Sequence, residues 1–103
     1  MRVTWSEEAR EAVRETSDYI WSEFGAKAKR KFLQEIGRIG SLLQKNPNLG
    51  QFEYYLKDCP EHYRSIVVNR LNKIVYYIHD NCVDIVAFWD TRREPREQAK
   101  EVK

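Results

Sequence analysis

The chain has 103 residues, 33% charged and 42% hydrophobic, so it is long enough for one modest core and too short for two. We therefore predict a single domain over residues 1–103, ending in a polar tail over residues 96–103. The formal net charge of +2 is too small to indicate a polyanionic partner by itself. No apolar run approaches the roughly 20 residues of a membrane span, and the N-terminus lacks a signal-peptide pattern. We expect a cytoplasmic protein without a membrane partner.

The two cysteines, Cys59 and Cys82, stand alone and show no CxxC spacing. In a reducing compartment this pattern favours two free thiols over a disulfide or a metal pair. The sequence therefore predicts no metal site, no cofactor and no small-molecule ligand.

The N-terminal half predicts a short strand followed by two helices. Met1–Trp5 alternates like a strand, and Ser6 is a suitable N-cap for the helix that follows. Apolar residues then recur at three- and four-residue steps until Gly25, which can take a left-handed conformation and end the helix.

A second apolar stripe begins near Ala28 and predicts a helix that ends near Asn46-Pro47, because a residue before proline avoids the helical region. The tight link at Gly25-Ala26 predicts an antiparallel helical hairpin. The cations Lys27–Lys31 lie in its first turns, where the helix dipole disfavours positive charge. They form either a solvated helix face or a patch for an anionic partner.

The C-terminal half contains three runs rich in Val, Ile and aromatic residues: Ser65–Val68, Ile74–Ile78 and Val83–Trp89. The polar breaks between them are too short for a parallel crossover, so they predict a three-stranded antiparallel meander. Gln51–His62 is expected to be an ordered, irregular loop, and Arg96–Lys103 a polar helical turn or a frayed tail.

The predicted order is β-α-α-β-β-β, which defines an α+β fold with an α-helical hairpin packed on one face of a mainly antiparallel sheet. The other face of the sheet, and a rim that carries arginines, are expected to remain open for a partner.

Short motifs follow one another along nearly the whole chain. They are Trp5 to Ala9, Tyr19-Ile20-Trp21, Phe24-Gly25, Asn46-Pro47, Tyr63 to Val68, Asn72 to Ile78 and Phe88 to Pro95. In this order and spacing the chain resembles the RelE/ParE superfamily. These proteins are toxins of bacterial type II toxin–antitoxin modules and are also described as plasmid stabilisation proteins.

The resemblance implies growth inhibition that a cognate antitoxin neutralises by wrapping a C-terminal segment around the toxin. It also implies one of two activities. RelE-like members cleave mRNA in the ribosomal A site without a metal ion, whereas ParE-like members poison DNA gyrase without chemistry of their own. A third possibility is an inactive module that keeps only antitoxin binding.

RNA cleavage through the 2′-hydroxyl needs a proton acceptor, cations for the phosphorane charge and a proton for the leaving oxygen. If the chain is a nuclease, the candidate catalytic residues are Arg64, Lys73, Tyr77 and Arg92. Strand alternation predicts that Lys73 and Tyr77 share a face with His79, a further candidate for proton transfer. Simple packing of the tyrosine and an exposed, merely polar histidine are the alternatives.

The C-terminal tail favours the other activity. RelE-like nucleases end in a tyrosine or a His–Tyr pair, whereas Arg96–Lys103 has neither an aromatic residue nor a histidine. Phe88 and Trp89 are the residues near the end that can stack on a base, and strand alternation is expected to bury one of them. We therefore favour ParE-like gyrase inhibition, with the ribosome-dependent mRNA nuclease as the alternative.

The predicted partner-binding surface consists of cations at strand ends and one carboxylate. Its residues are Arg64, Lys73, Asp90, Arg92 and Arg93. Asp90 is expected to orient an arginine; the alternative is a local salt bridge that contributes little to stability.

Overall fold

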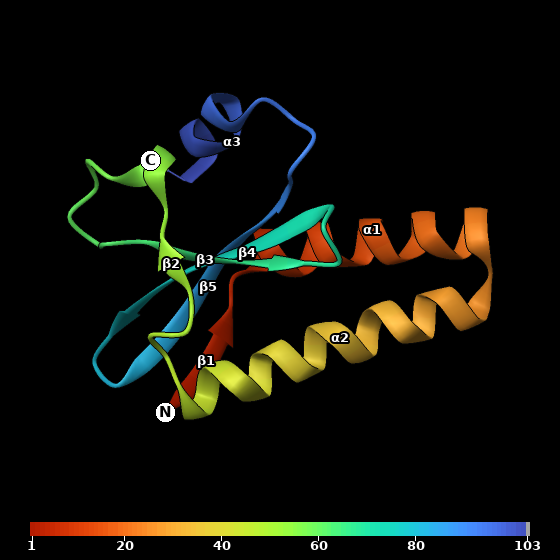
Figure 1. Cartoon of the computed structure of the whole chain (residues 1–103), viewed down its shortest axis with the longest axis horizontal. Coiled ribbons are helices and arrows are strands. Elements are labelled where there is room, and N and C mark those ends of the chain that lie inside the picture. Colours follow the sequence, from red (N-terminus) through yellow and green to blue (C-terminus); the bar gives the residue numbers. More distant parts are fainter. Residues whose placement is uncertain (103) are drawn as a thin grey trace.

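The computed structural model describes residues 1–102, which form an α+β fold (Figure 1). The elements are β1 (Arg2–Trp5), α1 (Glu7–Phe24), α2 (Ala26–Lys45), β2 (Gln51–Phe52), a 3-10 helix η1 (Tyr54–Leu56), β3 (Arg64–Val68), β4 (Asn72–His79), β5 (Cys82–Asp90) and α3 (Pro95–Val102). In this part of the chain the strands form one sheet in the order β1-β5-β4-β3-β2. Of its pairings, β1 with β5 is parallel and the others are antiparallel. The predicted fold class is confirmed.

The helical hairpin forms as the sequence predicts. Ser6 caps α1 by accepting a hydrogen bond at Oγ from the Ala9 backbone N–H at 3.0 Å. Gly25, at φ 93°, lies between the two helices, and its N–H donates to the Trp21 carbonyl. Since only Gly25 separates α1 from α2, the second helix starts two residues before Ala28.

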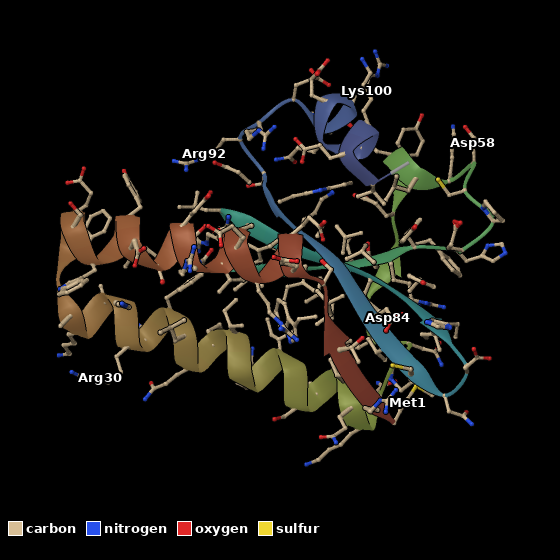
Figure 2. All side chains as sticks on the ribbon, turned by 180° about the vertical axis from the view of Figure 1, so that it is seen from behind. Met1, Arg30, Asp58, Asp84, Arg92 and Lys100 are labelled. Carbon is tan, nitrogen blue, oxygen red and sulfur yellow. The ribbon has the colours of Figure 1, made fainter. Side chains whose placement is uncertain are left out.

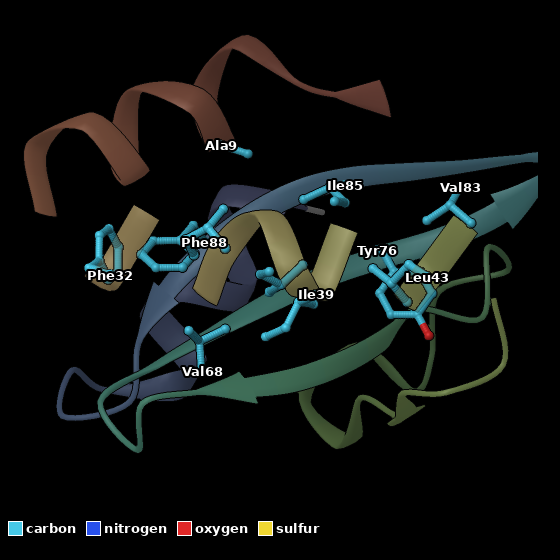
Figure 3. Packing of buried hydrophobic residues seen from close by; sticks show 11 residues of the cluster. Ala9, Phe32, Ile39, Leu43, Val68, Tyr76, Val83, Ile85 and Phe88 are labelled. Atoms are coloured by element: carbon cyan, nitrogen blue, oxygen red, sulfur yellow. The ribbon is translucent and has the colours of Figure 1, made fainter. Parts of the chain in front are cut away.

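One face of the sheet, here called the helix face, packs against α1 and α2 (Figure 3). Its buried residues are Ala9, Phe32, Ile36, Ile39, Leu43, Val68, Ile74, Tyr76, Val83, Ile85 and Phe88. The helical residues of this set recur along α2 at three- and four-residue steps, and the strand residues alternate, as the two periodicities require.

The opposite face, here called the second face, is partly covered, which corrects the expectation of an open surface. The Gln51–His62 segment is not irregular throughout, since it adds β2 to β3 and then forms η1. Leu56 of η1 and Ala99 of α3 pack with Trp89 over this face. Both Phe88 and Trp89 are therefore buried, rather than one of them, because each side of β5 has its own cover.

The C-terminal segment forms a docked helix. The helical alternative predicted for Arg96–Lys103 is therefore confirmed over the described residues, whereas the frayed polar tail is wrong. Pro95 opens α3, a position where its missing N–H costs nothing. Gln98 and Ala99 are buried, and Gln98 Nε2 donates to the Asp90 carbonyl at 3.0 Å. The sequence did not indicate that Gln98 and Ala99 would be buried, because most other residues of the segment are charged. Lys103, the last residue of the predicted tail, lies outside the described residues.

A β-bulge interrupts β5 opposite β4. Val75 pairs with Ala87 and Tyr76 pairs with Ile85, so Val86 is the extra residue. Pairing with β1 ends at Ile85, immediately before the bulge. Bulges bend a strand and increase its twist, so β5 leaves β1 at this point and continues towards α3 alone on that side.

Candidate functional site

Arg64 enters β3 on the helix face, near the chain segment that follows α2. Its Nη1 donates to the Gly50 carbonyl at 2.7 Å, and its guanidinium lies 4.1 Å from the centroid of the Phe52 ring. Both contacts direct the side chain towards the segment that follows α2. Arg64 is therefore held by backbone and aromatic partners within the chain.

Tyr76 lies beside Arg64 on the same face. Its hydroxyl donates to the Pro47 carbonyl at 2.7 Å and accepts from the Gly50 N–H at 2.8 Å. Burial raises the pKa of Tyr76, against smaller lowering effects of the Gly50 hydrogen bond and of Arg64. Arg64 and Tyr76 thus fix the turn after α2 to the sheet.

Lys73 lies on the second face, as the alternation predicts. Its ammonium forms an ion pair with Glu53, whose side chain is 4% exposed, while that of Lys73 is 18% exposed. The Nζ atom also lies 5.1 Å from the centroid of Trp89 and 5.8 Å from that of Tyr55. The cation is therefore enclosed by one carboxylate and two rings. Sequence reasoning missed Glu53 because nothing local links it to a lysine twenty residues away.

Tyr77 and His79 also share the second face, where their rings stack 5.0 Å apart at 14°. His79 Nε2 contacts the Asp84 carboxylate, and Nδ1 lies 3.3 Å from that of Asp80. Thr4 donates a hydrogen bond to Asp84. The parallel pairing of β1 with β5 brings Thr4 beside Asp84, and the sequence carried no sign of this pairing.

The hydrogen bonds of this cluster shift two pKa values in opposite directions. The Thr4 hydrogen bond, with smaller help from His79 and Cys82, lowers the pKa of Asp84 to about 2. Hydrogen bonds to Asp84 and Asp80 raise the pKa of His79. With a carboxylate at each ring nitrogen, the imidazole is stabilised as a cation, which suits an electrostatic role better than that of a general base.

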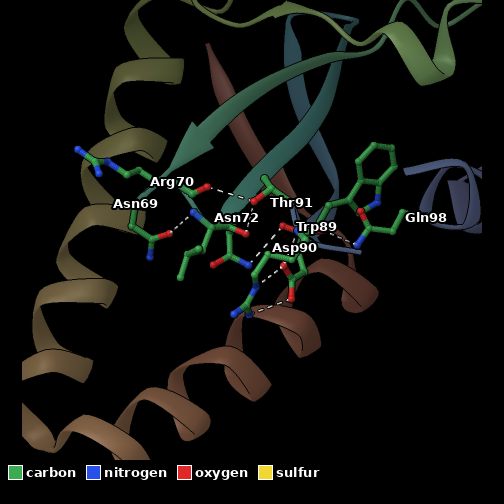
Figure 4. Close-up of polar contacts among 9 residues, drawn as sticks. Asn69, Arg70, Asn72, Trp89, Asp90, Thr91 and Gln98 are labelled. Atoms are coloured by element: carbon green, nitrogen blue, oxygen red, sulfur yellow. Dashed lines mark hydrogen bonds and ion pairs between the residues drawn. The ribbon is translucent and has the colours of Figure 1, made fainter. Parts of the chain in front are cut away.

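Asp90 is the last residue of β5 (Figure 4), and Arg92 and Arg93 follow it in the chain. Asp90 accepts from the Arg92 backbone N–H at 2.9 Å and from Arg92 Nε at 3.1 Å, and the Arg92 hydrogen bond lowers the pKa of Asp90. Arg93 pairs with Glu101 at 3.1 Å. The arginine side chains are 64% and 54% exposed. Asp90 and Arg92 therefore form an ion pair, which fits both the orienting role and the local salt bridge that the sequence left open.

The predicted site residues do not converge on one point. Lys73 and Tyr77 share the second face, Arg64 projects from the helix face, and Arg92 with Arg93 follows the end of β5. The predicted site residues are thus spread over three regions of the fold rather than gathered in a single pocket of cations.

Two further features bear on chemistry. Cys59 and Cys82 are free, and Cys82 is buried. Among residues 1–102, no group of His, Cys, Asp and Glu side chains is arranged to hold a metal ion, and no helix is long and apolar enough to cross a membrane.

Comparison with known proteins identifies the family. The family model described as the ParE toxin of the type II toxin–antitoxin system parDE matches residues 3–95, so the chain belongs to this family within the RelE/ParE superfamily. No curated protein sequence gives a significant match.

Two solved structures share the fold. A chain from the chromosomal ParDE toxin–antitoxin system of P. aeruginosa is 18% identical, with a TM-score of 0.71 over 87% of this chain and 95% of that one. A chain of the YoeB dimer from Staphylococcus aureus is 19% identical, with a TM-score of 0.58 over 84% and 92%. The family match makes the chain a toxin of the type II toxin–antitoxin class, and the ParDE and YoeB structures show that it shares their fold.

Proposed function

We propose that this toxin inhibits bacterial growth in the ParE manner, by binding DNA gyrase without chemistry of its own, and that a cognate antitoxin neutralises it. The family match supports the ParE side of the superfamily. The observation that carries the proposal is the dispersal of the candidate catalytic residues over both faces of the sheet.

Metal-free RNA cleavage requires cations and proton-transfer groups within reach of one phosphate. Arg64 and Lys73 lie on opposite faces, so the sheet itself separates them. Arg64 is also bound to Gly50, and Lys73 to Glu53. A phosphate would have to displace these partners before either cation could stabilise it, which favours an inhibitor over a nuclease.

The RelE-like alternative rests on one observation. Tyr77 and His79 form a stacked pair on the face that also carries Lys73, which is an arrangement that can contact a base and a phosphate. Against it, α3 provides no aromatic residue or histidine over residues 95–102.

We further propose that Asp90, Arg92 and Arg93 contact the partner, together with Arg64 and Lys73. The two arginines at the end of β5 are the most accessible of this set, and an exposed guanidinium can form a bidentate contact with a carboxylate. Because the Asp90–Arg92 pair is exposed, its loss should change stability by less than about 1 kcal/mol.

The test is induced expression of the chain alone in bacteria, followed by gyrase supercoiling assays and primer-extension mapping of mRNA. Growth arrest with trapped gyrase and intact mRNA is expected, and co-expression of the cognate antitoxin should restore growth. Discrete cuts in mRNA that vanish in Arg64→Ala would establish the nuclease instead. Harmless expression would identify an inactive, antitoxin-binding module.

The same assay tests the arginines. Arg92→Ala with Arg93→Ala should weaken toxicity or antitoxin binding at unchanged thermal stability. Arg10→Ala with Lys45→Ala, which also removes two exposed cations, serves as the charge-matched control. Loss of function only in step with unfolding would leave Arg92 and Arg93 as structural ion-pair residues.

A further inference from the structure

The outer half of β5 has one unoccupied edge. β1 pairs with Cys82–Ile85 and then leads through Ser6 into α1, while β5 continues to Asp90. Within residues 1–102 no strand pairs with Val86–Asp90 on this side. In Figure 2, β1 lies beside the lower part of β5, and the upper part of β5 continues towards Arg92.

Some backbone groups along this edge are already satisfied. The Ser6 N–H donates to the Ile85 carbonyl at 2.8 Å, and Ser6 Oγ donates to the Val86 carbonyl at 3.1 Å. The Asp90 carbonyl accepts from Gln98. These contacts satisfy backbone carbonyl groups at both ends of the edge, and the backbone groups in its middle remain to be considered.

The hydrogen-bond alternation of the β4–β5 pair places Phe88 in that middle. Thr91 N–H donates to the Leu71 carbonyl, so the directly opposed pairs two and four residues inward, Trp89 with Lys73 and Ala87 with Val75, are the bonded ones. The N–H and C=O of Phe88 consequently point away from β4, towards the free edge.

Two cavities border this edge. One, of about 550 Å³, is lined by Tyr63, Ala87, Trp89 and Val102 and reaches Glu8 on α1. The other, of about 290 Å³, is lined by Glu15, Thr16, Tyr19, Asn72 and Arg92. Ala12 and Phe88 line both, so the cavities adjoin and form one groove, here called the β5-edge groove.

The arrangement of the two cavities matches the alternation of an added strand. Ala87 and Trp89 face the second face, whereas Phe88 faces the helices. Successive side chains of a strand paired with Phe88 would enter the two cavities in turn. Shape therefore favours an extended polypeptide over a helix.

An independent observation also indicates a missing group. Trp89 is 2% exposed, and its Nε1–H has no acceptor among the described residues. Most buried donors are satisfied, so an orphaned donor on a residue that lines the larger cavity indicates an absent acceptor. A carbonyl or side-chain oxygen of an occupant in the larger cavity can supply it.

The charges around the groove select the occupant. Arg92 and Arg93 are neutralised by Asp90 and Glu101, whereas Glu8 and Glu15 form no ion pair with a residue in the 1–102 range. The wall formed by α1 is therefore anionic. We propose that the β5-edge groove receives an extended, lysine- or arginine-bearing segment of the antitoxin, which pairs with Phe88 and sets its cations against Glu8 and Glu15. This inference rests on the proposed toxin–antitoxin function.

Amide hydrogen exchange on the full chain, free and in complex with the co-expressed antitoxin, tests the backbone pairing. The Phe88 amide is expected to exchange roughly tenfold or more slowly in the complex. Equal exchange in both states would overturn the proposal, as would protection of Phe88 in a self-associated free chain, which would assign the groove to a second copy.

Charge reversal tests the occupant's chemistry. Glu8→Lys with Glu15→Lys should raise the Kd of the antitoxin complex about tenfold at low salt, because paired charges at an interface rim become repulsive. Glu7→Lys with Glu23→Lys is the control, since it changes the net charge and the first turn of α1 equally, and its Kd should stay within about twofold. Equal weakening by both pairs would overturn the assignment.

The two proposals fail differently. Neutralisation by an antitoxin that leaves Phe88 and the Glu8/Glu15 variant unaffected would overturn the groove and keep the toxin function. A chain that neither arrests growth nor binds an antitoxin would overturn both.

Discussion

The two faces of the sheet are covered by different kinds of elements. The helix face is covered by two long helices that supply Phe32, Ile36, Ile39 and Leu43 to one aliphatic and aromatic cluster. The second face is covered by a three-residue 3-10 helix and an eight-residue helix. Its buried residues share their surroundings with the Lys73–Glu53 ion pair.

The difference separates stability from interaction. Long helices with a regular apolar stripe bury area continuously, which is the dominant favourable contribution to folding. Short covers leave polar groups and cavities between them, and the orphaned Trp89 N–H lies on this second face. We expect truncation of a buried apolar side chain to destabilise the protein more on the helix face than on the second face, where substitutions also act on local geometry and partners.

The largest expected effect contrasts two buried leucines. Leu43 on α2 is 0% exposed and Leu56 on η1 is 1% exposed. Leu43→Ala should lower the free energy of unfolding by about 4 kcal/mol and Leu56→Ala by about 2 kcal/mol. The loss is smaller at Leu56 because the short helix η1 can collapse into the space that is left. Urea unfolding measures both, with Leu33→Ala, at an exposed position, as the control. Equal losses of unfolding free energy in the two variants would show that the two faces contribute alike to stability.

The buried ion pair gives the next effect. Glu53→Ala leaves the Lys73 ammonium without a partner in a largely enclosed site, and a loss of about 2–3 kcal/mol is expected. Adding Lys73→Met should recover most of it, since the double variant buries no lone charge. Chemical denaturation of the three variants checks this, and a double variant no better than Glu53→Ala would contradict it.

The turn after α2 offers a steric test on the helix face. A Cβ at Gly50 would lie 2.8 Å from Tyr76 Oη and 2.9 Å from the Ser65 carbonyl oxygen. Gly50→Ala should therefore destabilise by about 2 kcal/mol. A Cβ at Gly37 meets nothing within 4 Å, so Gly37→Ala should stabilise α2 by about 0.5–1 kcal/mol. Melting temperatures that shift in the same direction would refute the steric account.

The Asp84–His79 cluster gives the smallest effect, in its pH dependence. The lowered pKa of Asp84 contributes stability above its unfolded value near 4, and this is lost as the pH falls towards 2. The raised pKa of His79 contributes fully below 6.5 and is lost as the pH rises through the folded value. The cluster should therefore stabilise most between about pH 4 and 6.5.

Stability curves against pH for the natural chain and Asp84→Asn test this window. The Asp84 contribution is about 1 kcal/mol, below what the full shift implies, because solvent screens a side chain that is 26% exposed. The variant should flatten both flanks of the curve. A variant that retains the alkaline decline would assign that flank to the His79–Asp80 contact or to groups other than His79.

Local sequence patterns predicted much of the secondary structure. The Ser6 cap, the Gly25 link, the two apolar stripes and the meander each depend on neighbours within a few residues, and each is present. The shared face of Lys73, Tyr77 and His79 also followed from strand alternation alone. The family could be inferred because motifs in a fixed order constrain the whole fold.

The features that the sequence did not predict depend on contacts between segments that are distant in the chain. The sequence determined the helical hairpin, the strands of the meander and which side chains share a strand face, because these follow from periods of 3.6 and 2 residues. Only the tertiary structure decided that Arg64 and Lys73 lie on opposite sides, that Glu53 pairs with Lys73, that α3 covers Trp89 and that β1 ends halfway along β5. Such pairings depend on packing across tens of residues, which no local period encodes.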